Sequence, residues 1–202
     1  MIYLFIDTST THLCVSILNE EKELYRFNEL IEKDMASKIM LVINDALIQV
    51  NITLNDIDKI FVVNGPGSFT GIRVGVTVAK TIAWCLKKEI VPISSLEVLA
   101  TTQINTKYCI PMIDARRGNV FAGIYDKDLN LIEKDKLTNK DNLLIDKDRE
   151  YTIVSYDFNE VKPLINPMKI IMKHKQDNSI NPHYLNPCYL KMTEAEEKRN
   201  ND

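Results

Sequence analysis

Hydrophobic and polar positions follow the period of strands at the start of the chain and the period of helices after residue 34. Segments 2–7, 12–18 and 23–27 carry apolar or alternating patterns typical of strands, and the short links between them predict hairpins. Apolar positions then recur at helical spacing from 35 to about 50, with Asp34 as the expected N-cap. The chain is therefore expected to open with a β-meander followed by a helix.

The middle of the chain continues with alternating strands and helices. An apolar strand at 58–64 leads into a glycine-rich loop, a second helix from 70 to about 88, and a short strand at 91–93. Ser94 and Glu97 have the spacing of a capping box, which predicts a third helix to about residue 104. This order favours an α/β fold with a mixed sheet and helices on its faces.

The opening pattern then occurs a second time. Ile6-Asp7 followed by 13–18 corresponds to Ile113-Asp114 followed by 120–125, at a constant offset of 107 residues. Coincidence between two meanders is the simpler explanation, and duplication of one lobe is the sharper one. We expect an N-terminal lobe over 1–105 and a smaller C-terminal lobe over 106–202, without long helices in its proline-rich part and with a charged, solvated tail.

Both long helices are apolar over more of their circumference than packing on one sheet requires. In the first helix, Met40, Leu41 and Ile48 lie outside the main apolar stripe. In the second, small residues recur every four positions and form a ridge that another helix could approach closely. A partner protein is therefore expected to bind here. The predicted partner-binding residues are Met40, Leu41, Ile48, Gly71, Gly75, Val78, Ala79, Ile82 and Ala83.

Three loops carry groups that could bind an anion or a hydrated metal. They contain Asp7, Thr8 and Ser9; Gly65, Gly67 and Ser68; and Asp114 and Arg116. Carboxylates, hydroxyls, glycine-rich backbone and arginine all suit such ligands. Hydroxyl-rich hairpin turns and a glycine-rich helix entrance explain the same residues structurally. Both interpretations remain open, including one in which the first and last loops face each other across a cleft between the lobes.

Composition and charge narrow the possible functions. The net charge of -3 argues against a basic body that grips nucleic acid alone. The four scattered cysteines form no zinc or redox motif, and the three histidines lack helical metal-site spacing, so we expect neither metal nor cofactor. No segment approaches the ~20 apolar residues of a membrane span, and no basic leader precedes the first strand. A cytoplasmic location without membrane contact is therefore expected.

Four segments resemble the bacterial TsaB (YeaZ) family over nearly the whole chain. They are Ile6-Asp7-Thr8-Ser9; Asn64-Gly65-Pro66-Gly67-Ser68-Phe69-Thr70-Gly71-Ile72-Arg73-Val74-Gly75; Ile113-Asp114-Ala115-Arg116 with Gly118-Asn119-Val120-Phe121; and Pro187-Cys188-Tyr189-Leu190-Lys191. The central glycine-rich run is highly specific. The resemblance implies an actin/hexokinase/Hsp70-like (ASKHA, RNase H-like) fold of two duplicated lobes, in this chain with a reduced second lobe.

The resemblance also implies a function. Family members are non-catalytic scaffold subunits of the complex that forms N6-threonylcarbamoyladenosine (t6A) at position 37 of tRNAs reading codons that start with A. The expected partner is a TsaD-like catalytic subunit, bound through the helices at 34–50 and 70–88. A TsaE-like ATPase would join the assembly, and tRNA would be reached indirectly through the complex. A homodimer through the same helices is expected for the isolated chain.

The alternative is an ASKHA-type enzyme in its own right. An ATP-dependent phosphotransferase or a metallopeptidase-like protein could use Asp7 and Asp114, since a fold does not specify a function. The lack of metal-spaced histidines argues against this alternative, as does the absence of glycine after Gly123, where a nucleotide would need close backbone approach.

Overall fold

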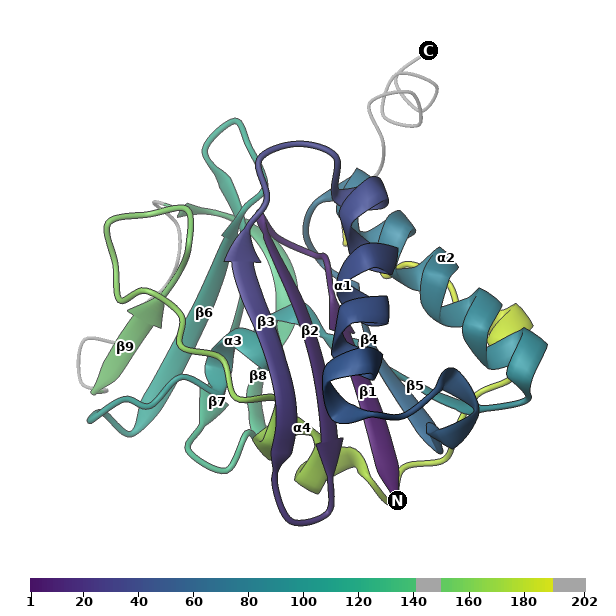
Figure 1. Cartoon of the computed structure of the whole chain (residues 1–202). Helices are drawn as coiled ribbons and strands as arrows, with labels where there is room; N and C mark the ends of the chain where they lie inside the picture. The colour runs from purple at the N-terminus through teal and green to yellow at the C-terminus, as the bar shows by residue number, and fades with distance from the viewer. Residues whose placement is uncertain (141–149, 191–202) are drawn as a thin grey trace.

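The first of two mixed β-sheets is built from the N-terminal half of the chain. The computed structural model describes residues 1–140 and 150–190 (Figure 1). The first sheet has the order β3-β2-β1-β4-β5, with β1 antiparallel to β2 and parallel to β4. Its strands are β1 (Ile2–Asp7), β2 (His12–Asn19), β3 (Glu23–Leu30), β4 (Lys59–Gly65) and β5 (Glu89–Ser94). All five coincide with predicted strands within three residues at each end. The apolar runs of β1, β2, β4 and β5 are buried, whereas the apolar side chains of β3 are only half-buried or exposed.

The second sheet repeats the arrangement of the first. Its order is β8-β7-β6-β9, with β6 antiparallel to β7 and parallel to β9, which reproduces the order β3-β2-β1-β4. The strands are β6 (Tyr108–Asp114), β7 (Asn119–Asp126), β8 (Leu131–Asn139) and β9 (Tyr151–Val154). The predicted duplication is therefore confirmed at the level of topology. The proposed boundary near residue 105 falls between α3 and β6 and stays a prediction.

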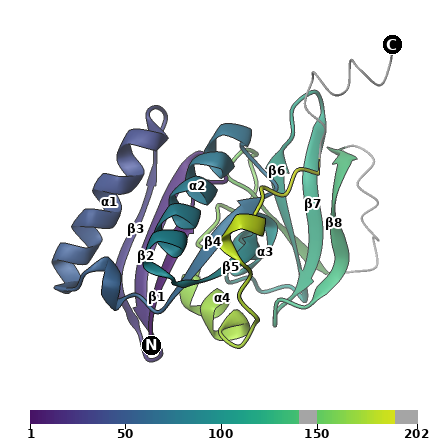
Figure 2. The ribbon, with the colours of Figure 1, turned by 90° about the vertical axis from the view of Figure 1, so that its right-hand side faces the viewer.

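Helices occupy different faces of the two sheets. The long helices α1 (Met35–Val50) and α2 (Phe69–Leu86) lie side by side on one face of the first sheet (Figure 2). On β1, Leu4 and Ile6 point to this face, while Tyr3 and Phe5 point to the opposite one. On that opposite face, α3 (Ser95–Ala100) and α4 (Pro167–His174) share a core with side chains of both sheets.

Two predicted helix caps differ in detail from the structure. Asp34 has a left-handed backbone, φ 61°, and its side chain makes no capping hydrogen bond. Ser94 does cap α3, since its Oγ accepts from the Leu96 N–H at 3.2 Å, but Glu97 does not complete the capping box. The Glu97 carboxylate instead binds Lys173 and His174 of α4. A tertiary contact has therefore replaced the local one.

The third helix is also shorter than predicted. It ends at Ala100, because the hydroxyls of Thr101 and Thr102 donate to the carbonyls of Val98 and Leu99 and close the last turn. The same hydroxyls accept the N–H groups of residues 166 and 164 and so fix the approach to α4. The end of α3 is thus set by its connection to a distant segment.

Within the described residues, α2 is long and apolar enough by length and composition to cross a membrane. The expectation that no segment approaches a membrane span is therefore not met by α2, on length and composition alone. In the structure one side of α2 is buried against the first lobe, through Gly71, Ile72, Gly75, Val76, Ala79, Ile82 and Ala83.

Candidate partner-binding surface

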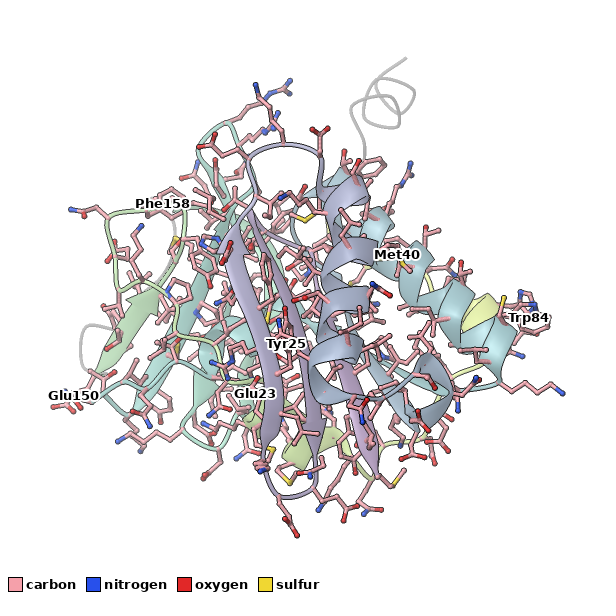
Figure 3. All side chains as sticks on the ribbon, viewed as in Figure 1. Glu23, Tyr25, Met40, Trp84, Glu150 and Phe158 are labelled. Atoms are coloured by element: carbon pink, nitrogen blue, oxygen red, sulfur yellow. The ribbon has the colours of Figure 1, made fainter. Side chains whose placement is uncertain are left out.

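The outward side of α1 carries exposed apolar side chains. Residues of the opposite stripe, Ile39, Ile43 and Ala46 among them, are buried against the sheet. Leu41 and Ile48 remain 66% and 67% exposed, and Met40 is 45% exposed between α1 and α2 in the view of Figure 3. The predicted separation of these three residues from the buried stripe is therefore observed. Their role in binding a partner remains a prediction.

The small-residue ridge of α2 faces the opposite way from the surface that was predicted. Gly71, Gly75, Ala79, Ile82 and Ala83 are all buried within the chain itself. A Cβ atom at Gly71 would overlap the backbone oxygen of Thr8, and one at Gly75 would overlap its Oγ1. These five residues therefore let α2 pack closely on the first lobe. Their burial does not favour contact with a partner, and the predicted role stays a prediction. Of the predicted residues on α2, only Val78 is half-buried rather than covered.

The glycine-rich loop before α2 is held by the turn between β1 and β2. Gly67 has φ +154°, and a Cβ atom there would overlap the carbonyl oxygen of Ser9. The Ser68 N–H donates to that same oxygen at 2.7 Å, and the Ser68 Oγ accepts the Gly71 N–H at 3.2 Å. Donors that could have faced an anion are thus used internally. The geometry therefore favours the interpretation of this loop as a glycine-rich entrance to α2 over that of an anion-binding loop.

The two candidate carboxylates lie in different environments. Asp7 is buried and its Oδ1 accepts the Ser9 N–H at 2.8 Å; burial raises the pKa of Asp7, against the effect of that hydrogen bond. Asp114 is exposed, and its Oδ1 accepts the Arg116 N–H at 2.8 Å. Each carboxylate therefore stabilises its own turn. Among the described residues, no group of three or more His, Cys, Asp or Glu side chains could hold a metal ion.

A contact between the two lobes, unforeseen from the sequence, lies beside Asp7. The register places Asp7, Cys14 and Asn28 in one row across β1, β2 and β3. Tyr156, which follows β9, stacks on His12 with ring centroids 3.9 Å apart. Burial raises the pKa of Tyr156 to about 12, with the negative charge of Asp7 adding to the effect. A residue of the second lobe therefore packs beside the row that contains Asp7.

A second unforeseen cluster lies at the start of α2. The rings of Phe69 and Tyr189 stack with centroids 4.8 Å apart, and the Arg73 guanidinium lies 3.8 Å from the Phe69 ring centroid. The Arg73 Nε donates to the Tyr189 hydroxyl at 2.8 Å. The sequence placed Tyr189 in a family motif but offered no signal that it would meet α2.

Comparisons with known proteins agree with this architecture. Residues 28–149 match the sequence model of the TsaD family, described as tRNA N6-adenosine threonylcarbamoyltransferase. Among solved structures, YeaZ-like proteins of Pseudomonas aeruginosa superpose with TM-scores of 0.82 and 0.79 at 19% and 20% identity. These superpositions cover 94% and 93% of this chain and 99% and 100% of those structures, and they show the shared fold. The class defined is an ASKHA-like α/β protein related to the threonylcarbamoyltransferases.

Curated relatives narrow the class to one family. The tRNA threonylcarbamoyladenosine biosynthesis protein TsaB of Bacillus subtilis is 32% identical over 98% of this chain and 97% of its own length. TsaB of Buchnera aphidicola (subsp. Schizaphis graminum) is 33% identical over 72% of each chain. The chain belongs to the TsaB (YeaZ) family, as the four sequence motifs indicated.

Proposed function

We propose that this chain is a non-catalytic, cytoplasmic subunit in the formation of t6A on tRNA, and that it supports a TsaD-like catalytic subunit. The exposed apolar side chains of α1 carry the proposal, because Leu41 and Ile48 present a hydrophobic ridge to solvent on a helix whose other side is already packed. The surface comprises Met40, Leu41 and Ile48 with the outward side of α2. It excludes the buried glycine and alanine ridge.

Two loops support the absence of catalysis. The glycine-rich loop directs its Ser68 N–H into the chain, and Asp7 is enclosed by its own turn. A substrate phosphate would have to displace these internal hydrogen bonds. In the proposed assembly the chemistry takes place on the TsaD-like subunit, a TsaE-like ATPase joins the complex, and tRNA is reached through the complex. A homodimer of the isolated chain would cover the same α1 surface.

Binding to a purified TsaD-family subunit tests the proposal. Leu41→Asp places a charge in the centre of the contact, so we expect affinity to fall by at least about thirtyfold in calorimetry, the size of a hot-spot loss of about 2 kcal/mol. Leu164→Asp is the matched control, because Leu164 is 69% exposed and lies in the C-terminal part of the chain, after β9. Equal affinity of the Leu41→Asp variant and the natural protein would remove the proposed surface.

Two further measurements separate this role from the enzyme alternative. Depletion of the protein in cells is expected to reduce t6A in bulk tRNA by nucleoside analysis. The isolated chain is expected to show no turnover of Mg-ATP. Catalytic turnover by the chain alone would instead support the phosphotransferase alternative.

A further inference from the structure

The segment 180–190, here called the strap, crosses the side of α2 that faces away from α1 (Figure 2). It contains the short helix η3 (Pro182–Tyr184). The Leu185 side chain fixes the strap to the first lobe, since it is buried in the core beneath α1 and α2. The outward face of the molecule on this side therefore consists of three neighbours, in the order α1, α2 and strap.

Hydrogen bonds from the first lobe hold the strap in place. The Lys80 Nζ donates to the carbonyl oxygens of His183 and Leu185, at 3.3 and 2.8 Å. Asn64 binds the strap at two points: its Nδ2 donates to the Asn186 carbonyl at 3.1 Å, and its own carbonyl accepts the Cys188 N–H at 2.6 Å. The strap is thus a fixed part of the surface beside α2.

The strap adds aromatic rings to both ends of α2. Near its start, Phe69, Arg73 and Tyr189 form the stacked cluster described above, here called the anchor cluster. At the other end, Trp84 meets the ring of His183 with centroids 3.9 Å apart, and Trp84 projects from the outer end of α2 (Figure 3). Tyrosine, tryptophan and arginine held in a fixed conformation dominate the binding energy of protein interfaces.

Within this surface, α2 and the strap carry no acidic side chain. Residues 69–86 and 180–190 contain no Asp or Glu, although the whole chain has a net charge of -3. Arg73 and Lys80 are exposed or half-buried here, but their donors are partly used by Tyr189 and by strap carbonyls. Cations engaged in this way order the rings more than they offer free charge, which favours a protein partner with a few carboxylates over the phosphate backbone of RNA.

We propose that the strap is part of the partner-binding surface and that the anchor cluster is its hot spot. The occupant is the TsaD-like subunit, seated across α1, α2 and the strap, with an apolar centre over Leu41 and Ile48 and a carboxylate that meets Arg73. The inference rests on the proposed function, because it assigns further residues to the same contact. Continuity of the exposed α1 ridge with α2 and the strap supports a single partner on all three elements.

Calorimetry with the full chain and a purified TsaD-family subunit tests this inference. Arg73→Ala and Tyr189→Ala are each expected to weaken binding by about tenfold or more, as loss of an interface anchor does. Tyr189→Phe keeps the ring stack and is expected to lose less. Lys140→Ala is the matched control, since Lys140 makes a comparable cation–π contact, 4.0 Å from the Phe158 ring centroid, in the second lobe.

The outcomes distinguish this inference from the proposed function. If Leu41→Asp weakens binding but the anchor variants do not, the contact stops short of the strap and the inference fails alone. If none of the variants weakens binding, both proposals fail. If the anchor variants bind the subunit normally but lose affinity for labelled tRNA, the strap contacts RNA and the inference is overturned. Thermal unfolding of each variant confirms that the comparison is between folded proteins.

Discussion

At the scale of single residues, α2 packs closely against the turn that follows β1. The Thr8 Oγ1 donates to the Gly71 carbonyl at 2.7 Å, and the same oxygen occupies the space that a side chain at Gly75 would need. Gly71 and Gly75 are therefore required because Thr8 lies against the helix. A glycine in a helix normally costs up to about 1 kcal/mol relative to alanine, and here the close approach outweighs that cost.

Gly75→Ala is accordingly expected to destabilise the protein by about 1–3 kcal/mol, because overpacking outweighs the gain in helix propensity. Guanidinium unfolding should show a lower midpoint with an unchanged slope. The double variant Thr8→Ala/Gly75→Ala removes the obstructing hydroxyl, so its loss should be smaller than the sum of the two single losses. Additive losses would show that Thr8 and Gly75 do not compete for the same space.

At the scale of elements, α3 and α4 are joined by a partly buried ionic cluster. The His174 Nε2 lies 2.9 Å from the Glu97 carboxylate and its Nδ1 lies 2.6 Å from Asp177, while the Lys173 Nζ binds Glu97 at 2.6 Å. Both ring nitrogens face carboxylate oxygens, an arrangement that favours the imidazolium, in which both nitrogens donate. Burial alone would lower the pKa of His174, but its hydrogen bonds to Glu97 and Asp177 outweigh burial and raise it.

This cluster makes stability depend on pH in a defined direction. A raised pKa means that the His174 contribution is complete below the ordinary value of 6.5 and is lost as pH rises through the folded-state pKa. The free-energy difference between the natural protein and His174→Gln should therefore be largest below about pH 6.5 and shrink above it. Denaturant unfolding from pH 5.5 to 9 measures this difference. A constant difference across that range would contradict a charged His174.

At the scale of the whole molecule, the two sheets share one hydrophobic core. The cluster around α3 and α4 contains Phe5 and Phe61 from the first sheet together with Ile113 and Phe121 from the second. Neither sheet can lose this contact without exposing large side chains of the other. We therefore expect the lobes to unfold together, although chains of this length often unfold in steps.

Phe121→Ala tests this coupling, since it creates a cavity in the second sheet and should cost about 3–5 kcal/mol. Trp84 is the single tryptophan and lies on α2, so its fluorescence reports on the first lobe. The midpoints by Trp84 fluorescence and by circular dichroism should fall by the same amount. A fluorescence transition that stays in place would show that the first lobe unfolds on its own.

Features that depend on neighbouring residues could be predicted from the sequence, whereas features that depend on contacts between distant segments could not. Ser94 caps α3 as predicted, because its hydrogen bond reaches only as far as the N–H of Leu96. Glu97 does not complete the predicted capping box, because its carboxylate binds Lys173 and His174 of α4. Leu41 and Ile48 are exposed as their helical spacing predicted. The anchor cluster at Phe69, Arg73 and Tyr189 had no local signal, since its two rings lie far apart in the sequence.

The order of strands and helices in the first lobe, the 107-residue repeat and the TsaB family motifs could be read from the chain alone, because each depends on residues close together or on a recurrent spacing. The helix α4 had no such signal. Only the tertiary structure decided three other features: the burial of the glycine ridge of α2, the hydrogen bond that holds Asp7 within its own turn, and the position of the strap. Each of these depends on which distant surfaces approach one another, and helical periodicity is the same whichever neighbour covers a face.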